Sequence, residues 1–117
     1  MTLNPLTPFS IVRGIAAAAI SISMFATAIA QEASHSITIR DGKFEPSTLN
    51  VAAGIKIKLT ITNATKKSAE FESAQLNREK VIAAGSSGTI YIGPLAPGTY
   101  PFFDDFNKST TGQIVAK

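Results

Sequence analysis

Residues 55–63 carry the most regular hydrophobic pattern of the chain. Four aliphatic side chains occupy every second position, separated by lysine or threonine, in the run Ile-Lys-Ile-Lys-Leu-Thr-Ile-Thr. A period of two residues is typical of a strand with one buried face. The pattern therefore predicts a strand over 55–63, in which each buried aliphatic side chain contributes roughly 1.5–3 kcal/mol.

Shorter β-branched or alternating segments predict further strands, each bounded by Gly, Pro or Asp-Gly turn signals. They are expected at residues 36–40, 48–51, 70–72, 79–82, 89–93, 99–103 and 113–116. Segments 44–47 and 104–112 are expected to be irregular, and 73–77 is expected to form one helical turn packed through Leu76. Short strands at this spacing predict an all-β fold, a Greek-key antiparallel β-sandwich.

The aromatic residues near the C-terminus fit such a core. Tyr100 follows the Pro97-Gly98 turn, so its hydroxyl is expected to hydrogen-bond back to the backbone of that corner. Core packing is the expectation for all four of Tyr100, Phe102, Phe103 and Phe106.

The first thirty residues differ from the rest. Arg13 is their only charged side chain, residues 14–30 are apolar or small, and the run ends in Ala28-Ile29-Ala30. This is the pattern of a cleaved signal peptide. The competing hypothesis, an uncleaved anchor, needs about 20 apolar residues, which is more than this run supplies. We therefore predict a signal peptide at 1–30 and one exported, periplasmic domain at 31–117, with no membrane insertion after cleavage.

Composition limits the chemistry that this domain can perform. The formal net charge is only +3, and lysine and arginine are spread along the chain, which argues against nucleic-acid binding. There is no cysteine, and both methionines, Met1 and Met24, precede residue 31. The predicted domain thus contains one imidazole, His35, and no sulfur. Because no disulfide can form without cysteine, the fold must be stabilised by its hydrophobic core.

Three segments resemble the small periplasmic cupredoxin-like domains associated with iron uptake, over residues 37–117. They are 41–49 (Asp-Gly-Lys-Phe-Glu-Pro-Ser-Thr-Leu), 69–80 (Ala-Glu-Phe-Glu-Ser, then Leu-Asn-Arg-Glu-Lys), and 93–103 (Gly-Pro-Leu, then Pro-Gly-Thr-Tyr-Pro-Phe-Phe). The middle segment is similar to the subgroup that accompanies ferrous-iron permeases, including the cupredoxin domain of EfeO-type proteins. The resemblance implies a cupredoxin fold and a role in iron handling.

One departure from that family bears on function. A type 1 copper site uses two histidines, a cysteine thiolate and usually an axial methionine. The resemblance places these ligands at Ala69, Asn107, Asp104 and near Thr111, and all four positions carry a different residue. It therefore implies a cupredoxin scaffold without a type 1 copper centre.

Oxygen donors remain at the same end of the predicted sandwich. If the sandwich closes as in the family, Glu70 and Glu72 meet Asp104 and Asp105, with His35 as a further candidate ligand. Carboxylates suit hard cations better than Cu(I). The expected cofactor is therefore an iron ion or a copper ion, the latter as Cu(II). In the alternative interpretation the two aspartates end a strand and their side chains accept N–H groups of the loop. The two glutamates then form ordinary surface ion pairs with Arg78 or Lys80, and His35 is a solvated surface residue.

Three functional hypotheses follow. The first is a periplasmic metal-handling protein that assists ferrous iron uptake, with an inner-membrane iron permease or its periplasmic components as partner. The second is a metal-free protein-interaction module, and the third is a Cu(II) carrier that uses His35. We do not expect a stand-alone enzyme, because the domain offers no electron acceptor of its own. A homodimer that completes a shared site remains open.

Overall fold

The computed structural model describes Gly14, residues 17–23 and residues 31–117. The predicted signal segment therefore lies mostly outside the described residues, including the Ala28-Ile29-Ala30 motif. Gly14 and residues 17–23 have no regular secondary structure. In the described part of the chain, no helix is long and apolar enough to cross a membrane.

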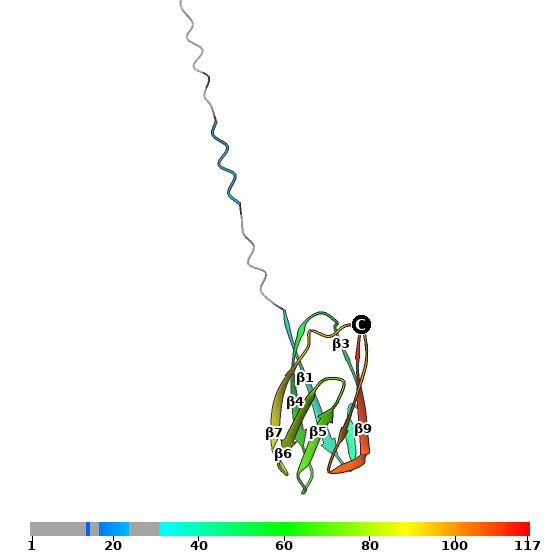
Figure 1. Cartoon of the computed structure of the whole chain (residues 1–117). Coiled ribbons are helices and arrows are strands. Elements are labelled where there is room, and N and C mark those ends of the chain that lie inside the picture. Colours follow the sequence, from blue (N-terminus) through cyan, green and yellow to red (C-terminus); the bar gives the residue numbers. More distant parts are fainter. Residues whose placement is uncertain (1–13, 15–16, 24–30) are drawn as a thin grey trace, which may run out of the picture.

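Residues 32–116 form an all-β sandwich (Figure 1). The strands that the structure describes are β1 (Glu32–Arg40), β2 (Lys43–Glu45), β3 (Thr48–Val51), β4 (Lys56–Asn63), β5 (Ala69–Ser73), β6 (Arg78–Ile82), β7 (Ser87–Ile92), β8 (Gly98–Asp104) and β9 (Asn107–Ala116). The predicted strand at 55–63 is confirmed over β4, whose inward side chains Ile57, Leu59 and Ile61 are fully buried. Ile55, the fourth predicted inward residue, precedes the strand and is only half-buried.

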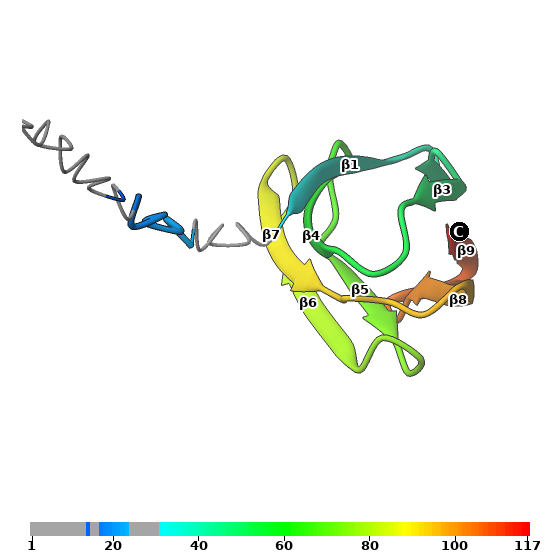
Figure 2. The same cartoon turned by 90° about the horizontal axis from the view of Figure 1, so that it is seen from above.

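The strands form a four-stranded sheet in the order β2-β1-β4-β7 and a five-stranded sheet in the order β3-β9-β8-β5-β6. Viewed from above, the strands surround a common interior (Figure 2). The predicted β-sandwich is confirmed, but its sheets are mixed rather than purely antiparallel. β1 pairs with β4, and β3 with β9, in parallel. Both pairings join segments that are not neighbours in sequence, so alternation within a strand does not reveal their direction.

An aromatic group fills the centre of the core. The ring of Phe102 lies 4.8 Å from that of Phe44 and 4.9 Å from that of Phe71, measured between centroids. All three side chains are buried, and each comes from a different strand. Such rings add edge and tilted contacts to their burial energy. Gly112 admits this packing, because a Cβ there would lie 2.5 Å from the Phe102 ring.

The two corners next to the core behave differently. The predicted tyrosine corner is confirmed, since the hydroxyl of Tyr100 donates to the carbonyl of Ala96 at 2.8 Å. At the opposite end, Phe106 is 56% exposed, so its predicted core position is wrong. Phe106 lies in the turn between β8 and β9, where no strand covers it.

Three predicted irregular or helical segments also require correction. Residues 43–45 form β2 because Phe44 anchors a short pairing with β1. Most of 104–112 belongs to β9, which extends the predicted last strand from residue 113 back to Asn107. The segment around Leu76 is a hydrogen-bonded turn rather than a helical turn, although Leu76 is buried as expected.

β6 is an edge strand of the five-stranded sheet and β7 is an edge strand of the four-stranded sheet, and the two sheets approach each other at these edges. There the side chain of Arg78, on β6, donates from Nε to the carbonyl of Tyr91, on β7, at 2.9 Å. This hydrogen bond links one sheet to the other.

Candidate functional site

Three glutamates meet on the outer face of the five-stranded sheet. Phe71 points into the core, so Glu70 and Glu72, its neighbours along β5, point outward. Glu79 lies directly opposite Glu72 in the antiparallel pairing of β5 with β6. Each of the three offers a carboxylate oxygen, and these oxygens all lie within 4.8 Å of one another. We call this set the glutamate cluster.

The charge of the cluster changes the titration of Glu70. Loss of hydration raises the pKa of the Glu70 carboxyl, and the negative charges of Asp105, Glu79, Glu72 and Asp104 raise it further. Like charges disfavour the ionised form in this way, and a cation placed among them would favour it. The local field therefore favours a positive ligand.

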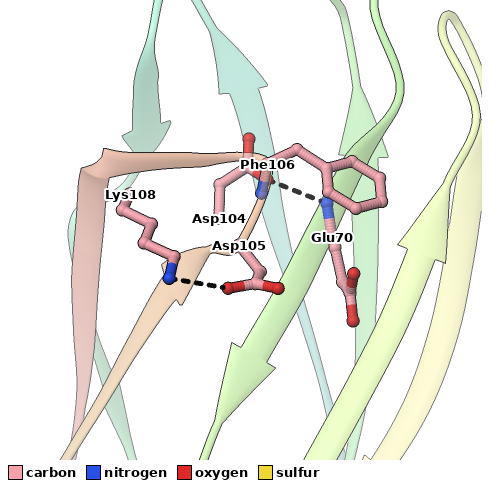
Figure 3. Close-up of polar contacts among 5 residues, drawn as sticks. All are labelled: Glu70, Asp104, Asp105, Phe106 and Lys108. Carbon is pink, nitrogen blue, oxygen red and sulfur yellow. Dashed lines mark hydrogen bonds and ion pairs between the residues drawn. The ribbon is translucent and has the colours of Figure 1, made fainter.

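Asp104 has a structural role beside this cluster. Its side chain is only 5% exposed, and its Oδ1 accepts the backbone N–H of Glu70 at 2.9 Å and that of Phe106 at 3.0 Å (Figure 3). A buried carboxylate is tolerated when backbone donors satisfy it in this way. Asp104 thus holds the turn after β8 against the start of β5.

Asp105 lies between the turn and the cluster. Its backbone N–H donates to the carbonyl of Glu70 at 2.9 Å, and its carboxylate lies 3.7 Å from Nζ of Lys108 (Figure 3). The backbone of Glu70 is therefore held by two consecutive aspartates, one through a side chain and one through an N–H. Asp105 contributes negative charge near Glu70 but is not one of the three clustered ligands.

His35 lies elsewhere in the molecule. It is half-buried on β1, in register with Leu59 of β4, and so belongs to the four-stranded sheet. The glutamate cluster is on the outer face of the other sheet. Of the five residues predicted as ligands, the structure brings together Glu70 and Glu72, and it adds Glu79.

Glu79 is not predicted as a ligand from the sequence, because the local pattern shows it only as the first residue of a strand. Its role could have been found from the hairpin itself. The turn at residues 74–77 sets Ser73 opposite Arg78, and the next pair outward from the turn is then Glu72 and Glu79. Directly opposed residues of antiparallel strands lie on the same face.

Two hollows lie near these residues. A small one of about 300 Å³ adjoins the cluster and is lined by Glu72, Ser73, Ala74, Asn77, Arg78 and Glu79. A larger one of about 500 Å³ lies at the loop end of the sandwich, among residues 39–42, 64–68 and 104–110. We call the second the loop-end hollow. Asp104 lines it, whereas the three clustered glutamates do not.

The donor set decides which metals fit the cluster. A blue copper centre requires a cysteine thiolate, and the chain contains no cysteine and only one histidine, which lies in the other sheet. A type 1 copper ion therefore does not fit the residues present. Three carboxylates instead match the oxygen ligands of hard divalent and trivalent cations.

Comparison with known proteins identifies the type of domain. Residues 13–116 match the family model described as a cupredoxin-like domain. An uncharacterized protein of Rickettsia prowazekii (strain Madrid E) is 45% identical over 74 residues, which cover 63% of this chain and 59% of that protein. The chain therefore spans about six tenths of the length of this relative.

Solved structures with the same fold include copper proteins. One is the metal binding domain of the Cu(I)-exporting P-type ATPase CopA of Streptococcus pneumoniae D39 with Cu(I), at 18% identity and a TM-score of 0.62, covering 72% of this chain and 84% of that one. Another is amicyanin from Paracoccus versutus, at 12% identity and a TM-score of 0.56, covering 72% and 81%. At such identities the likeness shows the fold alone.

Proposed function

Because this chain belongs to the cupredoxin-like domain family, we propose that it is an exported metal-handling protein whose site consists of carboxylates. The ligands are Glu70, Glu72 and Glu79, and the cation is iron. The role proposed for the protein is to bind or transfer iron during ferrous iron uptake in the periplasm.

The spacing of the glutamate cluster carries this proposal. Oxygen ligands lie about 2.0–2.6 Å from a hard cation, so two ligands of one ion are up to roughly 4–5 Å apart. The three carboxylate oxygens all lie within 4.8 Å of one another, which matches that range. The raised pKa of Glu70 supports the same conclusion, since a bound cation would relieve the repulsion that raises it.

The choice of iron over copper rests on donor chemistry and on the resemblance to permease-associated domains. Carboxylate oxygens favour hard cations, whereas Cu(I) favours thiolate and thioether sulfur. The metal binding domain of CopA named above was solved with Cu(I). In the present chain, however, the family resemblance puts Ala69, Asp104 and Asn107 at the positions of the two histidines and the cysteine of a type 1 site. A type 1 centre is therefore not part of the proposal.

Localisation and partner rest on the sequence. Residues 1–30 have the pattern of an export signal, and the segment 69–80 resembles domains that accompany ferrous-iron permeases. An inner-membrane iron permease, or one of its periplasmic components, is accordingly the partner that we propose.

Calorimetric titration of the purified protein with Fe(II) under anaerobic conditions, Mn(II) and Cu(II) tests the function. We expect micromolar binding of Fe(II), weakened at least about tenfold when Glu72→Gln and Glu79→Gln are combined, because even the loss of an outer-shell partner weakens metal sites by that factor. Glu32→Gln, a carboxylate change on β1 outside the cluster, is the control and should leave affinity unchanged.

The other outcomes separate the competing hypotheses. No heat with any of the three metals would overturn the metal site and favour a metal-free interaction module. Tight Cu(II) binding that is lost in His35→Ala and retained in the glutamate variant would instead support a copper carrier.

A further inference from the structure

The loop-end hollow is framed by three connections between strands. They are the turn at Asp41-Gly42, the loop at 64–68 and the turn at 104–107, which all contribute to its lining. Its volume of about 500 Å³ falls within the range of small-molecule pockets, roughly 300–1,000 Å³. The glutamate cluster does not reach it, so any ligand here is separate from the proposed metal.

A buried asparagine fixes the middle connection. Asn63 is completely buried, and its Nδ2 donates to the carbonyls of Lys67 and Ile82 at 2.7 and 3.0 Å. Its Oδ1 accepts the N–H and the hydroxyl of Thr65 at 3.0 and 2.7 Å. The amide group thus makes four hydrogen bonds, which hold the 64–68 loop in one shape.

The other two connections are fixed by buried polar groups as well. The hydroxyl of Thr110, which is 1% exposed, donates to the carbonyl of Gly42 at 2.8 Å. Asp104 fixes the third turn through the N–H of Phe106. In the described part of the chain the buried polar or charged residues are Asn63, Ser73, Asp104 and Thr110, so three of the four hold the rim of this hollow.

This concentration of buried polar groups indicates a preorganised site. A polar side chain in the interior loses hydration and adds stability only when fully hydrogen-bonded. What the buried polar groups provide is a rigid set of loops around an open hollow, which is how protein binding sites keep their contact groups in place.

The lining combines charges of both signs. The lining includes two lysines, Lys66 and Lys67, and two aspartates, Asp41 and Asp104. The backbone hydrogen bonds that Asp104 accepts from Glu70 and Phe106 both end on its Oδ1. Among the residues that the structure describes, none donates a hydrogen bond to Oδ2 of Asp104, so this oxygen can accept one from a ligand. The half-exposed ring of Phe106 provides an apolar wall. A simple anion would pair with the two lysines but would be repelled by the two aspartates, Asp41 and Asp104.

We propose that the loop-end hollow binds a small organic anion that also carries a hydroxyl group, that is, a hydroxycarboxylate. Its carboxylate pairs with Lys66 and Lys67, and its hydroxyl donates to Asp104. A ligand of this class offers a carboxylate to the two lysines and a hydroxyl donor to Asp104. A dicarboxylate without a hydroxyl has no such donor, so its negative charge would face the buried carboxylate of Asp104 directly.

Nuclear magnetic resonance titration of the metal-free protein tests the proposal directly. The probes are malate, succinate, glycerol and inorganic phosphate, of which malate and succinate differ by one hydroxyl. We expect malate to shift the amide signals of residues 64–68 and 104–107, with an affinity at least about tenfold above that of succinate, the size expected for a hydrogen bond to a charged group. Glycerol and phosphate should bind more weakly than malate.

Three variants assign the contacts. Lys66→Gln with Lys67→Gln should weaken malate binding at least about tenfold, whereas Lys43→Gln, an exposed lysine outside the lining, should not. Asp104→Asn keeps an oxygen to accept the two backbone N–H groups but removes the charge. It should therefore fold, as its spectrum will show, and reduce the preference for malate over succinate to near unity.

Several outcomes would overturn the proposal. One is the absence of shifts in these loops with millimolar malate; another is equal binding of malate, succinate and phosphate. A third is an unchanged preference for malate in folded Asp104→Asn. Because no metal is present and the glutamate cluster is intact in every variant, failure here leaves the iron site untouched, and failure of the iron site leaves this titration interpretable.

Discussion

The two outer faces of the sandwich follow the same alternation but carry different chemistry. On the four-stranded sheet, outward positions are mainly serine, threonine and lysine, and they lie in rows such as Ser36–Thr60–Thr89 across β1, β4 and β7. On the five-stranded sheet, Glu72 faces Glu79 directly, with Glu70 and Asp105 nearby. Both faces keep the alternation of inward and outward residues that the fold requires.

The outward residues of the two sheets differ in whether they stabilise the sheet that carries them. Threonine pairs and hydroxyl contacts, such as that between Thr62 and Ser87 at 2.8 Å, support a sheet. Like charges directly opposite each other weaken it by a similar amount. The opposed charges of the glutamate cluster therefore do not stabilise the sheet, which agrees with the proposed role of these residues as metal ligands.

The first way to test this comparison is to show that the inner sides of the two sheets are equivalent. Phe71→Ala should lower the free energy of unfolding by about 3–5 kcal/mol, because it removes a buried ring packed on Phe44 and Phe102. Leu59→Ala, on the other sheet, should cost about 2–5 kcal/mol. Urea denaturation measures both, and a loss below about 1 kcal/mol for either would show that one sheet contributes little to the core.

A smaller effect should distinguish the outer faces. Glu79→Gln removes one of two opposed negative charges, so in metal-free protein it should raise the free energy of unfolding by about 0.2–1 kcal/mol. The matched change on the other face, Lys58→Gln, should alter it by less than about 0.5 kcal/mol. If Glu79→Gln destabilises the metal-free protein, its carboxylate makes a favourable contact and the comparison fails.

The smallest effect is a dependence of stability on pH. Since the pKa of Glu70 is raised in the folded protein, the folded state takes up a proton before the unfolded chain does as pH falls. Between the raised pKa and the ordinary one, the free energy of unfolding should therefore increase as pH falls and decrease as pH rises. Glu70→Gln should flatten this part of the stability curve, and an unchanged curve would contradict the assigned pKa shift.

Local patterns in the sequence were sufficient for much of the fold. Alternation predicted β4 and its buried residues, and the Pro97-Gly98 turn predicted the hydroxyl contact of Tyr100. The start of β9 was missed because residues 107–112 are polar, although Thr110 is buried through its bond to Gly42. The hydrogen bond between Thr110 and Gly42 joins residues far apart in the sequence, so the local hydropathy around Thr110 does not indicate that it is buried.

The candidate site was predictable only in part, because it depends on pairing between strands. Glu70 and Glu72 follow from one strand, but Glu79 requires the register of the β5–β6 hairpin. The sequence alone does not exclude His35 as a ligand, because only the parallel pairing of β1 with β4 places it in the other sheet. Asp104 was predicted as a ligand, and the structure shows its Oδ1 engaged by two backbone N–H groups.

The contact between Arg78 and the carbonyl of Tyr91 also affects how these molecules behave when crowded together. β7 ends its sheet, and exposed backbone acceptors at such a position invite a strand from a neighbouring molecule to add on. The guanidinium already occupies one of them. This acceptor of β7 is therefore not available to a strand of a neighbouring molecule.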